Sequence, residues 1–238
     1  TRAKIAAGRA QRQAERIEYQ GKKATEAFAL HSQATPANDD HPYLTRKMAK
    51  AHPGVKVGTW RKWHQDEMGQ WQRLEILNTL LIPLIDPDGK LANLQGIFPE
   101  PHPLLGRDKD FMGGRTGGCL FLIGDDTDTI LIAEGYATAA TLHERTGHQA
   151  VITFYADNLK PVALTIRQHC PTARIIICAD NDRFTPGNPG VSKGREAALA
   201  CGGLLSIPPF ADDVQGTDWN DFYTAGRFPS SLKKANFG

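Results

Sequence analysis

The sequence predicts an α/β fold in which a Rossmann-like parallel sheet is flanked by helices. Two observations favour this fold: the second half of the chain contains short apolar runs rich in β-branched residues, and segments of helical composition alternate with them. Such runs are typical of strands buried on both faces of a parallel sheet. Alternation of strands and helices implies right-handed crossovers, so the carboxyl ends of the strands should lie along one edge of the sheet.

Four strands and three main helices are predicted in this half of the chain. The strands span residues 130–133, 151–154, 175–179 and 204–207. The helices span residues 137–145, 159–169 and 195–201. Gly147 is expected to end the first helix, Asn158 to cap the second and Pro171 to follow its end. The stretch GNPGVSKG before the third helix is expected to be a glycine-rich loop.

Acidic residues follow two of these strands directly. Glu134 comes after the first strand, and Asp180 and Asp182 come at the end of the third. A later cluster, GTDWNDF, contains Asp218 and Asp221 and leads into a short predicted helix. Carboxylates that converge at a sheet edge are suitable ligands for Mg²⁺ or Mn²⁺, and such ions serve phosphate chemistry. The sequence therefore predicts a metal site formed by these five acids.

Simpler interpretations exist for the acids. Glu134 taken alone is more often a helix cap or a solvated loop residue. Asp180 and Asp182 are harder to explain in that way, because side chains two apart on a strand end face the same way and repel each other. Unless a cation or an arginine compensates, one of the two should have a raised pKa. The glycine-rich backbone and the further acids favour a metal.

These motifs resemble a Toprim domain, the catalytic module of bacterial-type primases, type IA and type II topoisomerases and some nucleases. The family pattern has a glutamate–glycine pair after one strand and Asp-x-Asp after a later strand, here at 134–135 and 180–182. The finer pattern of EGYATAATL, ADNDRF and GTDWND is similar to primases of plasmids and bacteriophages. Thr138 stands where cellular primases often have a further aspartate, and it is not counted as a ligand.

The region before this domain resembles the segment that precedes Toprim in primases. LLIPLIDPDGKLANLQGIFPEP predicts two strands joined by a tight turn at 86–89, since an Asp-Gly pair lies between alternating apolar residues. KDFMGGRTGG holds the place of a lysine–aromatic motif, at Lys109 and Phe111, and HPYLTRK is similar to a motif of mobile-element primases. The predicted division is a basic helical segment at 1–39, a smaller α+β primase-type subdomain at 40–126 and a Toprim domain at 127–238.

Basic residues near glycine-rich turns are candidates for binding phosphate. Lys109, Arg115 and Lys193 would contact the triphosphate of an incoming nucleotide or the template backbone. Lysines and arginines in loops are nevertheless mostly solvated surface. A second group interleaves basic and aromatic residues, and is compatible either with a base-stacking patch or with the core of a small domain: Tyr43, Arg46, Lys47, Trp60, Arg61, Lys62 and Trp63.

Composition limits the classes of protein. A chain of 238 residues with 40% hydrophobic residues forms one large or two small domains. The net charge of +2 argues against a strongly basic, nonspecific DNA coat, so any contact with nucleic acid should be local and salt-sensitive. Residues 1–30 contain seven Lys or Arg and three Glu, and we expect a solvated helix there, more an exposed linker than a phosphate-binding element.

Several features are missing from the sequence. The four cysteines form no Cys-x-x-Cys pair, so no zinc site is predicted and free thiols are expected. Bacterial-type primases commonly carry a zinc-binding module before the catalytic core. Its absence and the lack of an initiating Met suggest an excised catalytic fragment, or a member that reads its template differently. No apolar run approaches the length of about 20 residues that spans a bilayer, and we expect a cytoplasmic protein.

The resemblance implies a DNA primase catalytic core that makes short primers on single-stranded DNA for plasmid or phage replication. A two-metal site of Mg²⁺ or Mn²⁺ is expected, in which Glu134 is either a ligand or the acid/base group. Nucleoside triphosphates, single-stranded DNA and a replicative helicase or relaxase are the expected partners.

Three other functions remain open. The first is a Toprim nuclease or phosphodiesterase, which the primase-like upstream half disfavours. The second is a haloacid-dehalogenase-like phosphatase, which is disfavoured because only 56 residues follow Asp182. The third is a non-catalytic module that binds single-stranded DNA.

Overall fold

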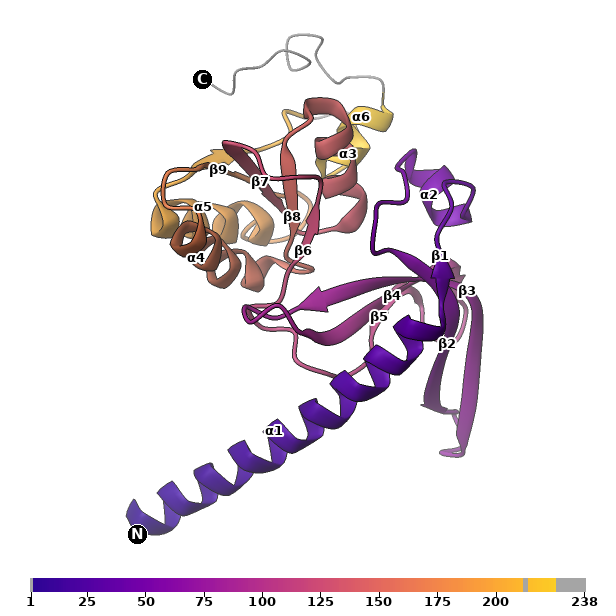
Figure 1. Ribbon diagram of the computed structural model, residues 1–238. Helices are drawn as coiled ribbons and strands as arrows, with labels where there is room; N and C mark the ends of the chain where they lie inside the picture. Colours follow the sequence, from indigo (N-terminus) through magenta and orange to yellow (C-terminus); the bar gives the residue numbers. More distant parts are fainter. Residues whose placement is uncertain (1, 212–213, 226–238) are drawn as a thin grey trace. The chain divides into compact units, whose positions relative to one another are not determined.

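The computed structural model describes residues 2–211 and 214–225, and the chain forms two compact units (Figure 1). The first unit comprises residues 1–37 and 54–116, and the second comprises residues 38–53 and 117–238. This division differs from the one expected from sequence, because residues 38–53 pack with the second unit. The amide nitrogen of His52 lies 3.0 Å from the hydroxyl of Tyr136, and Asn220 donates to the carbonyl oxygen of Lys47 at 2.6 Å.

The first unit is an antiparallel sheet with a long helix packed on it. The helix is α1 (Arg2–Gln33). The strands lie in the order in which they occur in the chain: β1 (Thr35–Pro36), β2 (Lys56–Gln65), β3 (Trp71–Ile85), β4 (Leu91–His102) and β5 (Arg107–Phe111). Ala27 of α1 is fully buried against Trp60, Leu94 and Phe98 of the sheet. Most other side chains of α1 are exposed, and none of the described helices is long and apolar enough to cross a membrane.

The tight turn predicted at 86–89 joins β3 to β4. The amide nitrogen of Gly89 donates to the carbonyl oxygen of Asp86 at 2.9 Å, and the carboxylate of Asp86 accepts hydrogen bonds from the backbone of Asp88 and Lys90. Gly89 has a φ of +79°, a conformation that glycine adopts without a steric cost. The Asp-Gly pattern therefore predicted this hairpin correctly.

The second unit is a mixed sheet with helices on both faces. The strand order is β10 (Leu204–Ser206), β9 (Arg174–Cys178), β7 (Thr129–Ala133), β8 (Gln149–Ile152) and β6 (Phe121–Ile123). All neighbours are parallel except β6, an edge strand antiparallel to β8. Helices α4 (Leu159–His169) and α5 (Pro189–Cys201) bury apolar side chains against one face, and α3 (Tyr136–Thr146) lies on the other (Figure 1). The predicted α/β fold is confirmed, with β6 as an addition.

The third helix of this unit begins earlier than the sequence predicts. Helix α5 starts at Pro189 and not near residue 195, so most of the glycine-rich stretch is helical. Pro189 occupies the first helical turn, where its missing N–H costs nothing, and the Asn188 side chain accepts from the amide nitrogen of Val191. Gly194 is needed for packing, since a Cβ there would lie 2.6 Å from the Cβ of Ala179.

Asn158 precedes α4 as expected, but its side chain does not cap the helix. Its amide is 1% exposed and connects three backbone groups of neighbouring segments. The side-chain oxygen accepts from the amide nitrogen of Gly118 at 2.7 Å, and the side-chain nitrogen donates to the carbonyl oxygens of Cys119 and Thr153 at 2.8 Å each. Asn158 therefore holds the start of β6 beside the end of β8.

We predict that Asn158→Ala lowers the free energy of unfolding by about 3 kcal/mol, because buried backbone groups lose their hydrogen-bond partners. Chemical denaturation followed by circular dichroism measures the change. Gln168→Ala, on the exposed side of the same helix α4, is the matched control and should be close to neutral. Equal stability of the two variants would contradict this role of Asn158.

Candidate metal and catalytic site

The sheet brings the two acidic motifs to the same edge. Strands β7 and β9 are parallel neighbours, with Ile132 opposite Ile177, and both strands end close to this pair. Glu134 follows β7 immediately, and Asp180 comes two residues after the end of β9. The expected meeting of acids at one sheet edge is thus a direct result of the strand order.

The pKa of Glu134 is strongly raised by this arrangement. Burial raises its pKa, and the nearby carboxylate of Asp182 raises it further, to about 7; the backbone N–H of Asp180 opposes the rise, and Asp157 and Asp218 add to it. Within the described part of the chain, the buried Oε1 atom of Glu134 has no hydrogen-bond partner. A buried polar atom without a partner costs folding free energy unless it binds a proton or a cation.

Asp182 is held by the start of α5. Its Oδ2 atom accepts a hydrogen bond from the amide nitrogen of Gly190 at 2.9 Å, where the positive end of the helix dipole favours a carboxylate. A Cβ on Gly190 would lie 2.3 Å from the carbonyl oxygen of Asp180, so no other residue fits without a backbone shift. The side chain of Asn188 also donates to that of Asn181, at 2.8 Å.

The acids of the GTDWND motif have structural partners. Asp218 caps α6 (Trp219–Thr224), since its Oδ1 accepts from the amide nitrogen of Asp221 at 2.7 Å. Asp221 forms an ion pair with Lys47, with 3.1 Å between Oδ1 and Nζ, and accepts from the backbone of Thr217. Burial alone would lower the pKa of Lys47, but Asp218 and Asp221 together raise it. Lys47 therefore compensates part of the negative charge of this motif.

The donor set fits a hard divalent cation in its chemistry. Glu134 interacts electrostatically with Asp182 and Asp218, and all the donors are oxygens, the ligands that Mg²⁺ and Mn²⁺ prefer. Across residues 2–211 and 214–225, however, no group of three or more His, Cys, Asp or Glu side chains is arranged to hold a metal ion. The carboxylates thus lie near one another without forming a complete coordination shell.

Comparison with known proteins places the second unit in a family. Residues 129–227 match the Toprim domain. The chain is 32% identical over 216 residues to a DNA primase TraC of Escherichia coli, a match that covers 87% of this chain and 18% of that protein. The second unit carries a Toprim domain. A second Escherichia coli TraC is 32% identical over 224 residues, covering 88% of this chain and 14% of that protein. The chain thus spans less than a fifth of the curated relatives that it matches.

Solved primase structures share the fold over both units. The RNA polymerase domain of Mycobacterium tuberculosis primase DnaG aligns with a TM-score of 0.56 at 14% identity, covering 89% of this chain and 80% of that one. A DnaG primase catalytic domain bound to single-stranded DNA gives a TM-score of 0.54 at 13% identity, covering 90% and 78%. This likeness is one of fold.

The predicted phosphate-binding residues lie in different units. Lys109 is in β5 and Arg115 follows that strand, whereas Lys193 belongs to the second unit. Lys193 lies inside α5, not in a loop, and its Nζ is 2.8 Å from Asp157. Asp157 and Gly190 were absent from the sequence-based site, because they have no distinctive sequence pattern. The sequence placed Lys47 in the HPYLTRK motif and in a basic and aromatic group, but did not predict it as a partner of the acids.

The members of that basic and aromatic group belong to different units. Tyr43, Arg46 and Lys47 lie in α2 (Pro42–Lys47) of the second unit, whereas Trp60 and Trp63 lie in β2 of the first. Tyr43 and Trp60 are buried, which agrees with the alternative that they belong to a core. Trp63, in contrast, is exposed.

We predict that Glu134→Gln stabilises the metal-free protein at pH 8. The pKa of Glu134 is raised on folding, so the folded state binds the extra proton and the wild type loses stability as the pH rises from about 4.5 to about 7. At pH 8 the free energy of unfolding of the variant should exceed that of the wild type by about 2 kcal/mol, and at pH 4 the two should agree. Chemical denaturation at both pH values in EDTA tests this. A constant difference across pH would contradict it.

Proposed function

We propose that this chain is the catalytic core of a DNA primase, which synthesises short primers on single-stranded DNA by metal-dependent nucleotidyl transfer in plasmid or phage replication. The observation that carries the proposal is the extent of the homology. Identity with DNA primase TraC covers 87% of the chain and therefore includes the first unit as well as the Toprim domain. A Toprim nuclease would be expected to resemble TraC in the second unit only.

The proposed metal ligands are Glu134, Asp180, Asp182, Asp218 and Asp221, and a two-metal site of Mg²⁺ or Mn²⁺ is part of the proposal. Divalent cations, when bound, lower the pKa of the primer 3′-hydroxyl and stabilise the pyrophosphate leaving group. Glu134 has a pKa of about 7, so at neutral pH it is suited either to accept the hydroxyl proton or to bind a cation as carboxylate.

The chain's other residues would position this chemistry. The amide nitrogen of Gly190 fixes the direction of Asp182, and Lys47 fixes Asp221. We propose that Lys109, Arg115 and Lys193 neutralise the phosphates of the nucleotide or the template; Lys193 would exchange its ion pair with Asp157 for a phosphate.

The proposed partners follow from this chemistry. They are single-stranded DNA, nucleoside triphosphates and a replicative helicase or relaxase, all reached in the cytoplasm. One of the structures that share this fold, the DnaG catalytic domain, is itself bound to single-stranded DNA.

We predict that Asp180→Asn abolishes primer synthesis, with a loss of at least about 100-fold, because the charge that would hold the cation is removed. The assay combines the chain, single-stranded templates, Mg²⁺ or Mn²⁺ and labelled ribo- or deoxyribonucleotides, and measures oligomers on a gel. Asp125→Asn, an exposed aspartate of the same unit, is the matched control and should keep full activity. Calorimetric titration with Mn²⁺ measures binding independently of turnover.

The proposal is overturned if the wild type cleaves the template without synthesis. It is also overturned if Asp180→Asn and Asp125→Asn are equally active, or if Mn²⁺ binds all three proteins alike.

A further inference from the structure

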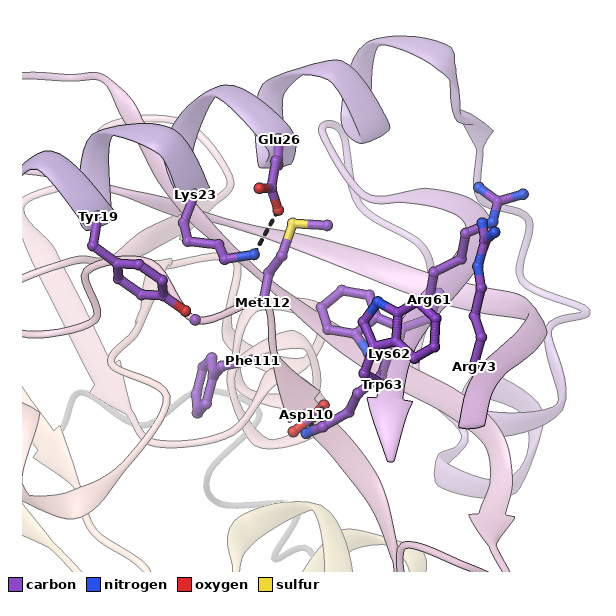
Figure 2. Close-up of a pocket in the computed structure, with 12 residues that line it drawn as sticks. Tyr19, Lys23, Glu26, Arg61, Lys62, Trp63, Arg73, Asp110, Phe111 and Met112 are labelled. Atoms are coloured by element: carbon purple, nitrogen blue, oxygen red, sulfur yellow. Dashed lines mark hydrogen bonds and ion pairs between the residues drawn. The ribbon is translucent and has the colours of Figure 1, made fainter. Parts of the chain in front are cut away.

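The first unit contains a cavity of about 600 Å³ that shares no residue with the carboxylate site (Figure 2). It is lined by α1, by β2 and β3, and by the end of β5 with the two residues that follow it. Figure 2 shows Tyr19 and Phe111 on one side of this pocket and Trp63 on another, with basic side chains between and around them. Trp60 lines the pocket as well, and it is buried in the core beneath.

The pocket presents aromatic surface to solvent. Trp63 is 62% exposed and Tyr19 is 53% exposed, although burying either ring would have stabilised the unit. The aromatic surface continues beyond the pocket, since Trp71 is 65% exposed. Trp63 pairs with Arg73 and Gln65 pairs with Trp71 across the β2–β3 hairpin, so both tryptophans lie on one face as diagonal neighbours. Flat rings spaced along one face are suited to stacking successive bases.

Basic residues outnumber acidic residues in the lining of the pocket. Four basic residues line it, Lys23, Arg61, Lys62 and Arg73, against the two acids Glu26 and Asp110. Lys23 pairs with Glu26 at 2.7 Å, and Lys62 shares Asp110 with Arg107, at 2.6 and 2.7 Å. Arg61 and Arg73 share one exposed carboxylate, Glu75, at 2.9 and 3.4 Å. A guanidinium has five N–H donors, and two arginines on one acid therefore keep donors for another anion.

This charge pattern favours a polymer over a free nucleotide. A triphosphate concentrates several negative charges within a few ångströms and needs a compact cluster of cations. The pocket instead offers two undercompensated arginines beside Trp63, which suits phosphates carrying one charge each better than a triphosphate. We propose that this pocket binds a nucleotide of single-stranded nucleic acid, with its base stacked on Trp63 and its flanking phosphates bound by Arg61 and Arg73. The inference rests on the proposed function only for the kind of polymer expected.

The test measures binding of a fluorescein-labelled oligo-dT strand to the full chain by fluorescence anisotropy, in EDTA and without nucleotides. Trp63→Ala should weaken binding at least about fivefold, since loss of one stacked base has effects of that size or larger. Trp63→Phe should restore most of the affinity. Phe28→Ala, which removes an exposed ring of α1 outside the pocket, is the matched control and should bind like the wild type. Because Trp63 is exposed, these variants should fold normally, which circular dichroism checks.

Two further measurements make the result decisive. Arg61→Ala combined with Arg73→Ala should flatten the slope of log affinity against log salt by about 0.7 for each phosphate that is no longer neutralised. Strands carrying 5-iodouracil should crosslink under light to Trp63 or Tyr19, as identified by mass spectrometry. Equal binding by Trp63→Ala and Phe28→Ala overturns the proposal, as do crosslinks confined to the second unit. Displacement of the strand from the pocket by metal-free ATP at equal affinity also overturns it.

This experiment is separate from the test of catalysis. It contains no metal ion and no nucleoside triphosphate, so a chain that failed to make primers would still give the expected binding result. A chain that made primers and bound strands independently of Trp63 would refute this inference alone.

Discussion

The close packing of α5 against the end of β9 is the constraint on which the acidic site depends. Gly190 and Gly194 both face this strand end, and a Cβ at either position would come within 2.6 Å of the loop or strand. The absence of side chains lets the first turn of the helix reach Asp182 with a backbone N–H. The helix therefore supplies both the packing that orders the acidic loop and the partial positive charge that its carboxylate needs. A bulkier residue at either glycine would prevent this packing and move the backbone N–H away from Asp182.

The same packing forces negative charges together. Glu134 is partly buried and interacts with Asp182 and Asp218, and its pKa rises to about 7 because low solvation and these neighbours oppose its ionisation. Two kinds of interaction compensate part of the repulsion among the carboxylates. Lys47 forms an ion pair with Asp221, and backbone N–H groups donate hydrogen bonds to Asp182 and Asp218. The repulsion that these interactions do not compensate raises the pKa of Glu134. A carboxyl group with such a raised pKa makes the fold less stable when no cation is bound. Perturbed groups of this kind are common at functional sites.

Local patterns predicted most of the second unit, because a buried parallel strand and a following acid can both be seen in a few adjacent residues. Long-range effects were not visible in that way. Asn158 looks like a helix cap in sequence, but its amide connects β6 to β8. The start of α5 was missed since glycines suggest a loop, whereas here they permit close approach to Ala179. Residues 38–53 join the second unit through Tyr136 and Asn220, partners more than 80 residues away.

The first unit combines a packed core with aromatic residues that remain exposed. Where α1 covers the sheet, side chains such as Ala27 and Trp60 are buried in a packed core. The outer half of the β2–β3 hairpin instead carries exposed tryptophans that do not belong to this core. Lys62 of β2 reaches Asp110 of β5, although these strands are not neighbours in the sheet, so the sheet curls around the pocket. Helix α1, the hairpin and the end of β5 leave a cavity of about 600 Å³ between them, with the exposed rings of Tyr19 and Trp63 on its wall. Stability alone would favour closing that space.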